Sequence, residues 1–291
     1  MSAHDDVRPR RSVLYMPSSN ARALEKARTI AADALIFDLE DAVAPDAKAT
    51  AREQACQAVA DGGYGGREVT IRCNGLDTPW GADDLAAAAA AGPAAIVVPK
   101  VSGTEHLGRL TDVLEKAGVP DHTALWPMIE TPAGVFGVRE IAAFPRVAAF
   151  VLGTNDLAKE LRAALLPGRA ALVPHLATAL LGAREAGIAC LDGVFNDVKD
   201  AEGFETECRQ GAQLGFDGKT LIHPNQVDVA NRVWAPTQDE IEFSRKVVDA
   251  FAEAERDGRG VVTVDGKMIE NLHRDNALRT LAVAESIAAL G

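Results

Sequence analysis

Basic residues are scarce in this chain relative to acidic ones. Its 291 residues include 30 Lys and Arg against 42 Asp and Glu, a formal net charge of -12. This charge excludes nucleic acid and anionic membrane as the main partner, because both repel an acidic surface. The same repulsion acts on anionic substrates, so a substrate of that kind needs a local cationic site. Arg72 and Lys100 are the candidates for it.

Cysteine is also rare. Four cysteines occur, Cys56, Cys73, Cys190 and Cys208, and no two form a CxxC pair. This usage indicates reduced thiols in a cytosolic protein rather than a disulfide scaffold or a zinc site. Residues 1–11 are polar and charged and show no apolar secretory core. No window approaches the roughly 18 apolar residues of a membrane span. We therefore expect a cytoplasmic protein with no membrane partner.

What the chain does contain is a regular alternation of short apolar segments and amphipathic segments. The apolar segments have two apolar faces, as parallel strands covered by helices do. Eight strands are predicted, at 12–16, 34–39, 68–72, 95–99, 124–129, 147–152, 189–192 and 218–222. Helices are predicted at 20–32, 46–60, 81–91, 104–117, 132–143, 169–186, 198–213 and 225–233. Eight strand–helix units indicate an α/β fold, a TIM (β/α)8 barrel.

The alternation of short apolar and amphipathic segments stops near residue 235. We therefore predict a barrel at 1–235 and a C-terminal helical extension at 236–291. Thr237 and Glu240 have capping-box spacing at the start of a helix expected to end at Glu255. A turn at 257–260, a strand at 261–264, a turn at 265–266 and a helix at 267–290 are expected to follow. An eight-unit barrel has no place for this extension. We expect it to pack outside the barrel or to reach a neighbouring subunit.

Two carboxylates follow adjacent predicted strands. Glu130 comes directly after the strand at 124–129, and Asp156 comes shortly after the next one. Reacting groups of such barrels lie at the C-terminal strand ends, so the two side chains could converge. Two carboxylates together with water and substrate oxygens are the usual ligands of Mg²⁺. The alternative is that each carboxylate caps the following helix, which is weaker for Glu130 because Thr131 could already do so.

A second charged group follows the second and third strands. Asp38, Glu40 and Asp41 are three acids within four residues, and strand alternation directs Asp38 and Glu40 toward the barrel mouth. Like charges this close raise a pKa unless a cation neutralises them. Arg72 ends the third strand, and its planar guanidinium suits a carboxylate or an enolate oxygen. The alternatives are a solvated turn for the acids and a structural ion pair for Arg72.

Two glycine-containing motifs suggest phosphate binding and are rejected. Gly218-Lys219-Thr220 resembles the end of a P-loop, but Gln213 stands where that motif needs glycine, and the segment falls in or just before a strand. The run at 62–66 precedes a strand, so it belongs to the face of the barrel away from the chemistry. Both are expected to be structural.

Nine segments, in order along almost the whole chain, match one known family. They are Arg11–Pro17, Asn20–Ala27, Phe37–Val43, Ile71–Asn74, Val98–Val101, Ile129–Gly134, Gly153–Leu157, Gly218–Gln226 and Asp265–Ile269. On these segments the chain resembles the citrate lyase β-subunit-like (CitE-like) family of the HpcH/HpaI aldolase superfamily.

The resemblance implies a TIM-barrel, Mg²⁺-dependent carbon–carbon lyase that acts on acyl-CoA thioesters. Glu130 and Asp156 would be the metal ligands. The substrate would contact Arg72, Glu130 and Lys100. Family members are commonly trimers or hexamers in which the C-terminal segment reaches a neighbour's site, so we expect a homo-oligomer.

The resemblance also implies which residues lie near CoA. At one position this chain departs from the pattern of the family. Asn20, Arg22 and Lys26 would lie near CoA. Many family lyases carry an aspartate, delivered by the adjacent subunit as acid and base, where this chain has Glu270. Glutamate is one methylene longer, and a misplacement of about 1 Å can cost on the order of 100-fold in rate. Either the lid is adjusted to Glu270 or the substrate differs; His273 could assist, or could be a surface residue.

We therefore predict cleavage or formation of a 3-hydroxyacyl-CoA. The products would be an acetyl-type thioester and a 2-oxo acid such as glyoxylate, pyruvate or oxaloacetate. Arg72 would stabilise the developing negative oxygen, and Glu270 or a water held by Asp38 or Glu40 would move the proton. Three alternatives stay open: a class II 2-oxo acid aldolase without CoA, a lyase subunit served by an acyl-carrier protein, and a non-catalytic ligand-binding homologue.

Overall fold

The computed structural model describes residues 8–256 and 261–290. They fall into two compact units: residues 10–233 form one, and residues 234–290 with residues 8 and 9 form the other. The turn expected at 257–260 lies outside the described residues. No helix among the described residues is both long and apolar enough to cross a bilayer.

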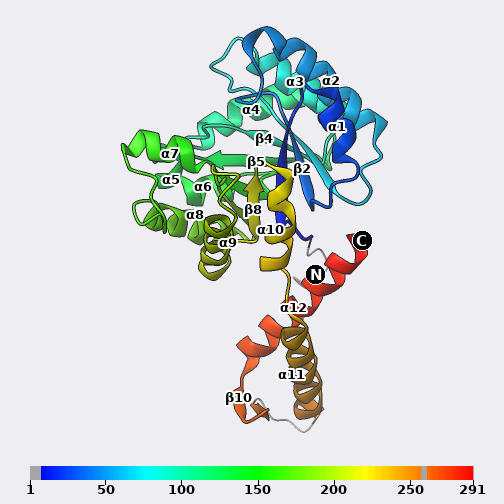
Figure 1. The fold of residues 1–291 in the computed structure, drawn as a ribbon, viewed down its shortest axis with the longest axis vertical. Coiled ribbons are helices and arrows are strands. Elements are labelled where there is room, and N and C mark those ends of the chain that lie inside the picture. The colour runs from blue at the N-terminus through cyan, green and yellow to red at the C-terminus, as the bar shows by residue number, and fades with distance from the viewer. Residues whose placement is uncertain (1–7, 257–260, 291) are drawn as a thin grey trace. The chain divides into compact units, whose positions relative to one another are not determined.

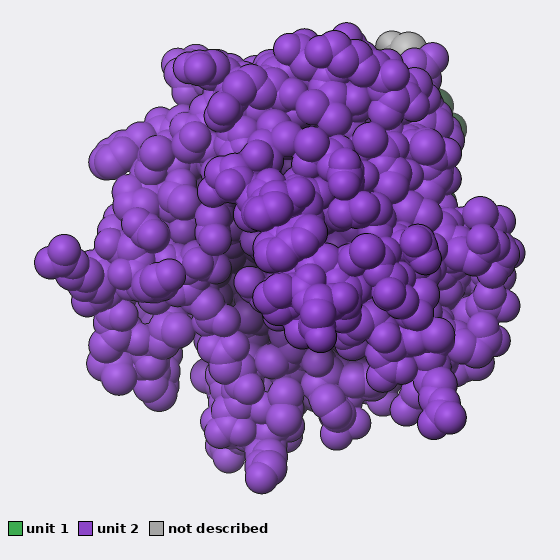
Figure 2. All heavy atoms as spheres, turned by 90° about the horizontal axis from the view of Figure 1, so that it is seen from above, with its two compact units in different colours: residues 1–9, 234–291 green, residues 10–233 purple. Residues whose placement is uncertain are grey.

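The larger unit is a closed barrel of parallel strands, which confirms the predicted fold class. Each strand pairs with the next along the chain, and the last pairs with the first (Figure 1). The strands are β1 (Ser12–Pro17), β2 (Ala34–Asp38), β3 (Glu68–Arg72), β4 (Ala95–Val98), β5 (Ala124–Ile129), β6 (Ala149–Leu152), β7 (Ala189–Asp192) and β8 (Gly218–Leu221). In a space-filling view the surface of this unit is hollowed near its middle (Figure 2).

Helices surround the barrel. They are α1 (Ala21–Ala27), α2 (Lys48–Asp61), α3 (Gly81–Ala91), α4 (Thr104–Lys116), α5 (Pro132–Phe136), α6 (Val138–Ala142), α7 (Thr154–Leu161), α8 (Val173–Ala186), α9 (Ala201–Leu214) and α10 (Val227–Val233). Short 3-10 turns, η1 (Pro45–Ala47) and η2 (Pro224–Gln226), precede α2 and α10. Gly92 and Gly187 end α3 and α8 with φ of 64° and 71°, a left-handed conformation that favours glycine.

Three helix predictions for the barrel were wrong. The segment 132–143 is not one helix, because the chain turns at Gly137, whose N–H donates to the carbonyls of both Ala133 and Gly134. The helix α7 was missed, since its first turn coincides with the strand-end segment that carries Asp156. The first helix ends at Ala27 rather than at residue 32, because residues 28–30 form tighter turns.

Strand alternation decides which side chains enter the barrel. The core of the barrel consists of inward-facing residues at alternate strand positions, among them Val13, Ala34, Ile36, Ala95, Val97, Trp126, Met128, Ala149, Val151 and Leu191. The next positions of the same parity are Tyr15 on β1, Asp38 on β2 and Glu130 after β5. After β6 and β7 these positions are Gly153 and Gly193. The apolar interior therefore ends in a layer that is polar on some strands and lacks side chains on others.

A buried charge network links β7, β8 and α9. Lys219 on β8 is fully buried, and its Nζ lies 3.0 Å from Asp192 and 2.8 Å from Glu207. Arg169 donates to the other oxygen of Asp192 at 2.7 Å. Burial alone would raise the pKa of Asp192, but Lys219 and Arg169 outweigh it and lower that pKa below its ordinary value. The Gly218-Lys219-Thr220 motif is therefore part of a strand and a structural ion pair, as expected.

The smaller unit contains α11 (Gln238–Arg256), β9 (Val262–Val264), β10 (Lys267–Ile269) and α12 (Asn271–Leu290). The Thr237–Glu240 capping box is confirmed: each residue's backbone N–H donates to the side chain of the other, at 2.7 and 3.2 Å. The prediction of helix from residue 267 was wrong. Asp265 and Gly266 have φ of 45° and 79°, which suits a tight hairpin turn, so residues 267–269 pair with β9.

Replacing Lys219 tests the buried network. In Lys219→Met, Asp192 and Glu207 lose a cationic partner inside the protein, which typically costs about 3–5 kcal/mol. For a chain of this size, we expect the Tm to fall by roughly 6–20 °C. Differential scanning calorimetry measures this, with Lys116→Met on the exposed face of α4 as the matched control. A Tm for Lys219→Met equal to that of the control would contradict the assignment.

Candidate active site

A pocket of about 420 Å³ opens at the C-terminal ends of the barrel strands. Four of the predicted site residues line it together: Asp38, Arg72, Glu130 and Asp156. They come from β2, from β3, from the end of β5 and from the start of α7, which are far apart in the sequence. The parallel barrel therefore brings these residues to one mouth, as the sequence predicted.

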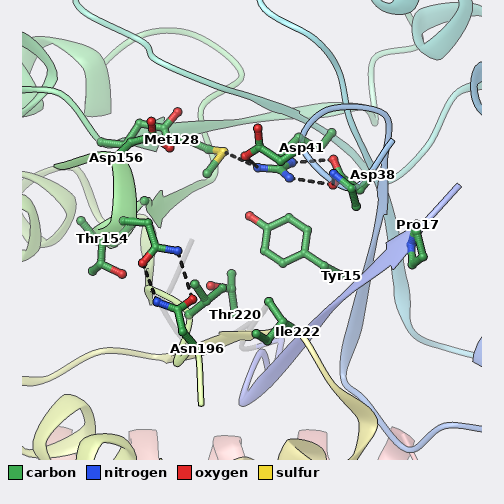
Figure 3. A pocket seen from close by; sticks show the side chains of 17 residues that line it. Tyr15, Pro17, Asp38, Asp41, Met128, Thr154, Asp156, Asn196, Thr220 and Ile222 are labelled. Atoms are coloured by element: carbon green, nitrogen blue, oxygen red, sulfur yellow. Dashed lines mark hydrogen bonds and ion pairs between the residues drawn. The ribbon is translucent and has the colours of Figure 1, made fainter. Parts of the chain in front are cut away.

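Asp38 and Arg72 form a buried, two-point ion pair. They are register partners across β2 and β3, which places their side chains side by side. Arg72 Nε and Nη2 donate to the two oxygens of Asp38 at 2.6 and 2.7 Å (Figure 3). Asp38 also accepts the backbone N–H groups of Glu40 and Ala42. With four hydrogen bonds accepted, Asp38 is fixed as the holder of Arg72.

Glu40 contacts this pair through Arg72 and is not among the residues that line the pocket. Its carboxylate is 2.9 Å from Arg72 Nη1. Burial nevertheless raises the pKa of Glu40 to about 8. Arg72 opposes this rise, and Asp41, Glu130 and Asp38 add to it. Arg72 does not offset the effect of burial on the pKa of Glu40, because Asp38 already pairs with the guanidinium. Glu40 can therefore hold or release a proton near neutral pH.

Glu130 lies in a position shaped for its side chain. It is 2% exposed, and one oxygen accepts the backbone N–H of Lys100 at 2.7 Å. A Cβ added at Gly153 would collide with the Glu130 side chain, so glycine at that position makes room for the carboxylate. Thr131, not Glu130, caps α5, with its hydroxyl accepting the N–H of Gly134 at 3.0 Å. The helix-capping alternative for Glu130 is therefore wrong.

Asp156 lies in the first turn of α7 and lines the same pocket as Glu130. No hydrogen bond or ion pair among the described residues holds its carboxylate. Burial raises the pKa of Glu130 to about 7; the N–H of Lys100 opposes this, and Asp156 adds to it. Arg72 and the Lys100 ammonium also lower the pKa of Glu130, but neither forms an ion pair with Glu130 or Asp156 among the described residues, so the two carboxylates leave room for a cation.

The donor set fits Mg²⁺. Both donors are carboxylates, and no group of three or more His, Cys, Asp or Glu side chains in the described part of the chain forms a metal cluster. A cation held by Glu130 and Asp156 would therefore take its other ligands from water and substrate, which is how Mg²⁺ is usually bound.

Lys100 is placed at the rim rather than in the pocket. Its backbone has φ of 51°, and its side chain is exposed. Burial lowers the pKa of Lys100, but Asp156, Glu40 and Glu130 outweigh this and hold it above the ordinary value. The ammonium group therefore faces the acidic mouth and stays charged.

The residues predicted to lie near CoA are outside the pocket. Asn20 caps α1 by accepting the N–H of Ala23 at 3.2 Å, and Arg22 and Lys26 are exposed on the same helix. The N–H of Asn20 donates to the carbonyl of Pro17, which does line the pocket. Asn20, Arg22 and Lys26 therefore come shortly after β1, the strand whose last residue lines the pocket.

Glu270 is carried by the smaller unit, immediately before α12. It is exposed, and its backbone N–H donates to Nδ1 of His273 at 3.0 Å. His273 therefore caps the start of its own helix, the structural alternative left open by the sequence.

Several pocket residues were missed. Tyr15 lies in the middle of the pocket (Figure 3), and the alternation of Val13 and Tyr15 on β1 was a signal that could have found it. Asn155 and Asn196 exchange two amide hydrogen bonds, at 3.1 and 2.8 Å, on one wall (Figure 3). Asn196 lies on a loop after β7, and a loop has no periodic sequence pattern that predicts where its side chains point.

A closed (β/α)8 barrel that brings two carboxylates and one arginine into a single pocket at the C-terminal strand ends is the architecture of a barrel enzyme of the aldolase type. The sequence profile of the HpcH/HpaI aldolase/citrate lyase family matches residues 11–224, and the chain belongs to this family. Aldolases and citrate lyases both act on carbon–carbon bonds, so the predicted enzyme class is confirmed.

Curated relatives match nearly the whole chain. A (3S)-malyl-CoA thioesterase of Cereibacter sphaeroides is 50% identical over 283 residues, which is 97% of this chain and 97% of that protein. The citrate lyase subunit beta of Escherichia coli strain K12 is 38% identical, over 96% of this chain and 94% of that protein.

Solved structures agree with the fold. The protein CitE of Mycobacterium tuberculosis, in complex with magnesium, acetoacetate and coenzyme A, superimposes with a TM-score of 0.76 at 26% identity. The match covers 95% of this chain and 98% of that one. A citrate lyase from Burkholderia xenovorans has a TM-score of 0.83 over 100% of this chain and 99% of that one, at 18% identity, which supports the fold alone.

Gly153 provides a test of the carboxylate position. In Gly153→Ala the new methyl group displaces the Glu130 side chain, and a shift of about 1 Å at a reacting group can cost on the order of 100-fold in rate. We expect kcat/KM to fall by about that factor with the fold retained. Gly108→Ala on α4 is the control, because nothing lies within 4 Å of the added Cβ. Equal kcat/KM in the two variants would show that Glu130 does not depend on Gly153.

Glu40 should be visible in the pH dependence of stability. An unfolded glutamate releases its proton near 4.5, whereas the folded chain holds it up to about pH 8. The folded state therefore binds more protons in this window, and its stability falls as pH rises.

We expect Glu40→Gln to reduce the fall in Tm between about pH 5 and about pH 8, measured by thermal denaturation in EDTA. Glu53→Gln on the exposed face of α2 should keep the wild-type slope. The pKa assignment is wrong if the Glu40→Gln slope also matches that of the wild type.

Proposed function

We propose that the chain cleaves, or in reverse forms, a malyl-CoA-type 3-hydroxyacyl thioester with Mg²⁺, giving an acetyl-type thioester and a small 2-oxo acid. One observation carries the proposal: Glu130, Asp156 and Arg72 line one pocket at the C-terminal strand ends. It is supported by relatives whose names contain malyl-CoA and citrate lyase, and by a CitE structure with magnesium and coenzyme A.

The proposed reaction begins at the hydroxyl next to the bond that breaks. This hydroxyl loses its proton, the carbon–carbon bond breaks, and the electron pair moves into the thioester as an enolate that is then protonated on carbon. Bound Mg²⁺ would supply Lewis-acid polarisation at the oxygens of the 2-oxo acid. Glu130 and Asp156 would hold it, and Arg72, oriented by Asp38, would place positive charge beside the reacting oxygens.

Proton transfer has two candidate routes. Glu40 exchanges protons near neutral pH and adjoins Arg72, so it could act through a water in the pocket. Glu270 would act from the smaller unit of a neighbouring copy. Lys100 at the rim would attract the carboxylate of the acid, and Asn20, Arg22 and Lys26 would face the CoA side.

We further propose a homo-oligomer, a trimer or hexamer, in the cytoplasm. Phe136 on α5 is 90% exposed and Leu181 on α8 is 73% exposed, and both are apolar groups that a subunit contact would cover. All four cysteines are free thiols, which suits a reducing compartment.

Thioester hydrolysis is a second candidate function. The 50% identity to a (3S)-malyl-CoA thioesterase over 97% of both chains favours it. A thioesterase would release malate and free CoA, whereas a lyase releases glyoxylate and acetyl-CoA. The two reactions are therefore separated by their products.

The test is an assay of the purified chain with (3S)-malyl-CoA and Mg²⁺, with products resolved by liquid chromatography. We expect glyoxylate and acetyl-CoA in equal amounts. Glu130→Gln and Asp156→Asn should each lower turnover by about 100-fold or more. At about 100 times its Kd, Mg²⁺ should stabilise the wild type by about 2.7 kcal/mol, which raises its Tm by roughly 5–10 °C. Neither variant should show this rise.

Glu105→Gln on the surface of α4 is the matched control and should behave as the wild type. Malate and CoA as the sole products would favour hydrolysis. Cleavage of a free hydroxy-oxo acid without any thioester would favour the CoA-free aldolase. Full Mg²⁺-dependent turnover in either carboxylate variant would reject the metal site.

A further inference from the structure

Tyr15 is a pocket residue to which the proposed mechanism gives no role. It projects from β1 into the middle of the pocket, with its hydroxyl end directed into the open space (Figure 3). That hydroxyl has no hydrogen-bond partner among the described residues. It is also not among the fully buried polar atoms that lack partners, so it faces the cavity. A phenol placed in this way has a donor available for a ligand.

The other candidate donor in the pocket is largely occupied. Arg72 directs Nε and Nη2 to Asp38, and Nη1 lies 2.9 Å from Glu40 and 3.5 Å from Asp41. Each nitrogen of the guanidinium therefore already faces a carboxylate. Arg72 can supply positive charge to the site, but it has little freedom to turn toward a new oxygen.

The surroundings hold Tyr15 in place and keep it protonated. The guanidinium carbon of Arg72 lies 4.7 Å from the centre of the Tyr15 ring, a cation–π contact that fixes the ring face. Burial raises the pKa of Tyr15 well above its ordinary value; Arg72 on β3 opposes this, and Asp38, Glu130 and Glu40 add to it. The hydroxyl therefore stays a donor across the working pH range of a protein.

We propose that the Tyr15 hydroxyl donates a hydrogen bond to the thioester carbonyl oxygen of the substrate and is a catalytic residue. This inference rests on the proposed lyase function. When the carbon–carbon bond breaks, its electron pair forms the enolate double bond and the thioester oxygen gains a negative charge. Tyr15 keeps its proton and strengthens its hydrogen bond as that charge grows; the proton that completes the acetyl group goes to carbon from the acid.

The chain offers a matched control, because it contains two tyrosines. Tyr64 also has a cation against its ring, Arg28 at 5.5 Å, but its hydroxyl donates to the carbonyl of Leu24 outside the pocket. Tyr15→Phe and Tyr64→Phe each remove one hydroxyl and leave the ring. Loss of a donor to a developing oxyanion costs about 100-fold or more in kcat.

The first experiment compares the two variants on (3S)-malyl-CoA with Mg²⁺. We expect Tyr15→Phe to lower kcat by about 100-fold with KM changed by less than about threefold, because the bond strengthens in the transition state. Exchange of the methyl protons of acetyl-CoA with D2O should slow by the same factor. The Tm and its rise with Mg²⁺ should be unchanged. Tyr64→Phe should match the wild type in kcat, KM and exchange rate, because its hydroxyl lies outside the pocket.

A second experiment does not depend on Tyr15→Phe folding. In the Tyr64→Phe background Tyr15 is the sole tyrosine, so biosynthetic incorporation of 3,5-difluorotyrosine changes this phenol alone. Fluorination makes the phenol more acidic, and an ionised phenol cannot donate. Activity should therefore fall at high pH in the fluorinated enzyme, at a lower pH than in the tyrosine enzyme. A ring that only fills space would leave the pH profile unchanged.

The outcomes separate the two proposals. If the wild type makes glyoxylate and acetyl-CoA and Tyr15→Phe retains kcat within about threefold, the role of Tyr15 is wrong and the proposed function stands. An unshifted pH profile in the fluorinated enzyme has the same meaning. If the wild type does not cleave malyl-CoA or exchange the protons of acetyl-CoA, the proposed function fails, and the role of Tyr15 fails with it.

Discussion

The two-point ion pair between Asp38 and Arg72 is the interaction on which the site depends. Both groups are buried at the mouth of the barrel, where an unpaired charge would cost several kcal/mol. Pairing in register across β2 and β3 removes that cost and fixes the plane of the guanidinium. The fixed plane in turn covers the ring of Tyr15 and approaches Glu40, so one pair orients two further groups.

The carboxylates of the pocket differ in how far their surroundings neutralise their charge. Asp38 is neutralised by Arg72 and accepts two backbone N–H groups. Glu130 accepts one backbone N–H and shares the pocket with Asp156, and its pKa rises to about 7 through burial first and Asp156 second among the causes that raise it. The protein therefore satisfies one acid internally and leaves two others short of positive charge. Glu130 and Asp156 are therefore suited to binding a divalent cation, whereas Asp38 is suited to holding Arg72 in position.

Local patterns in the sequence predicted most of the elements and failed at specific places. Strands β3, β5 and β7 have the predicted bounds, because their apolar runs end sharply at polar or glycine residues. The helix α7 was missed because its first turn is polar and coincides with the site. The strand β10 was missed because the hairpin is set by the left-handed turn at Asp265 and Gly266 rather than by an apolar pattern.

The sequence by itself determined the barrel and the charged residues at its mouth, because strand period and helix period are local properties of the chain. It also determined that Glu130 and Asp156 come from adjacent strand–helix units. Only the tertiary structure decided which charges meet. Arg72 meets Asp38 through strand register, Gly153 leaves space for Glu130, and Tyr15 lines the pocket with a hydroxyl that no other described residue binds. These are consequences of register and packing between distant segments, which no local pattern encodes.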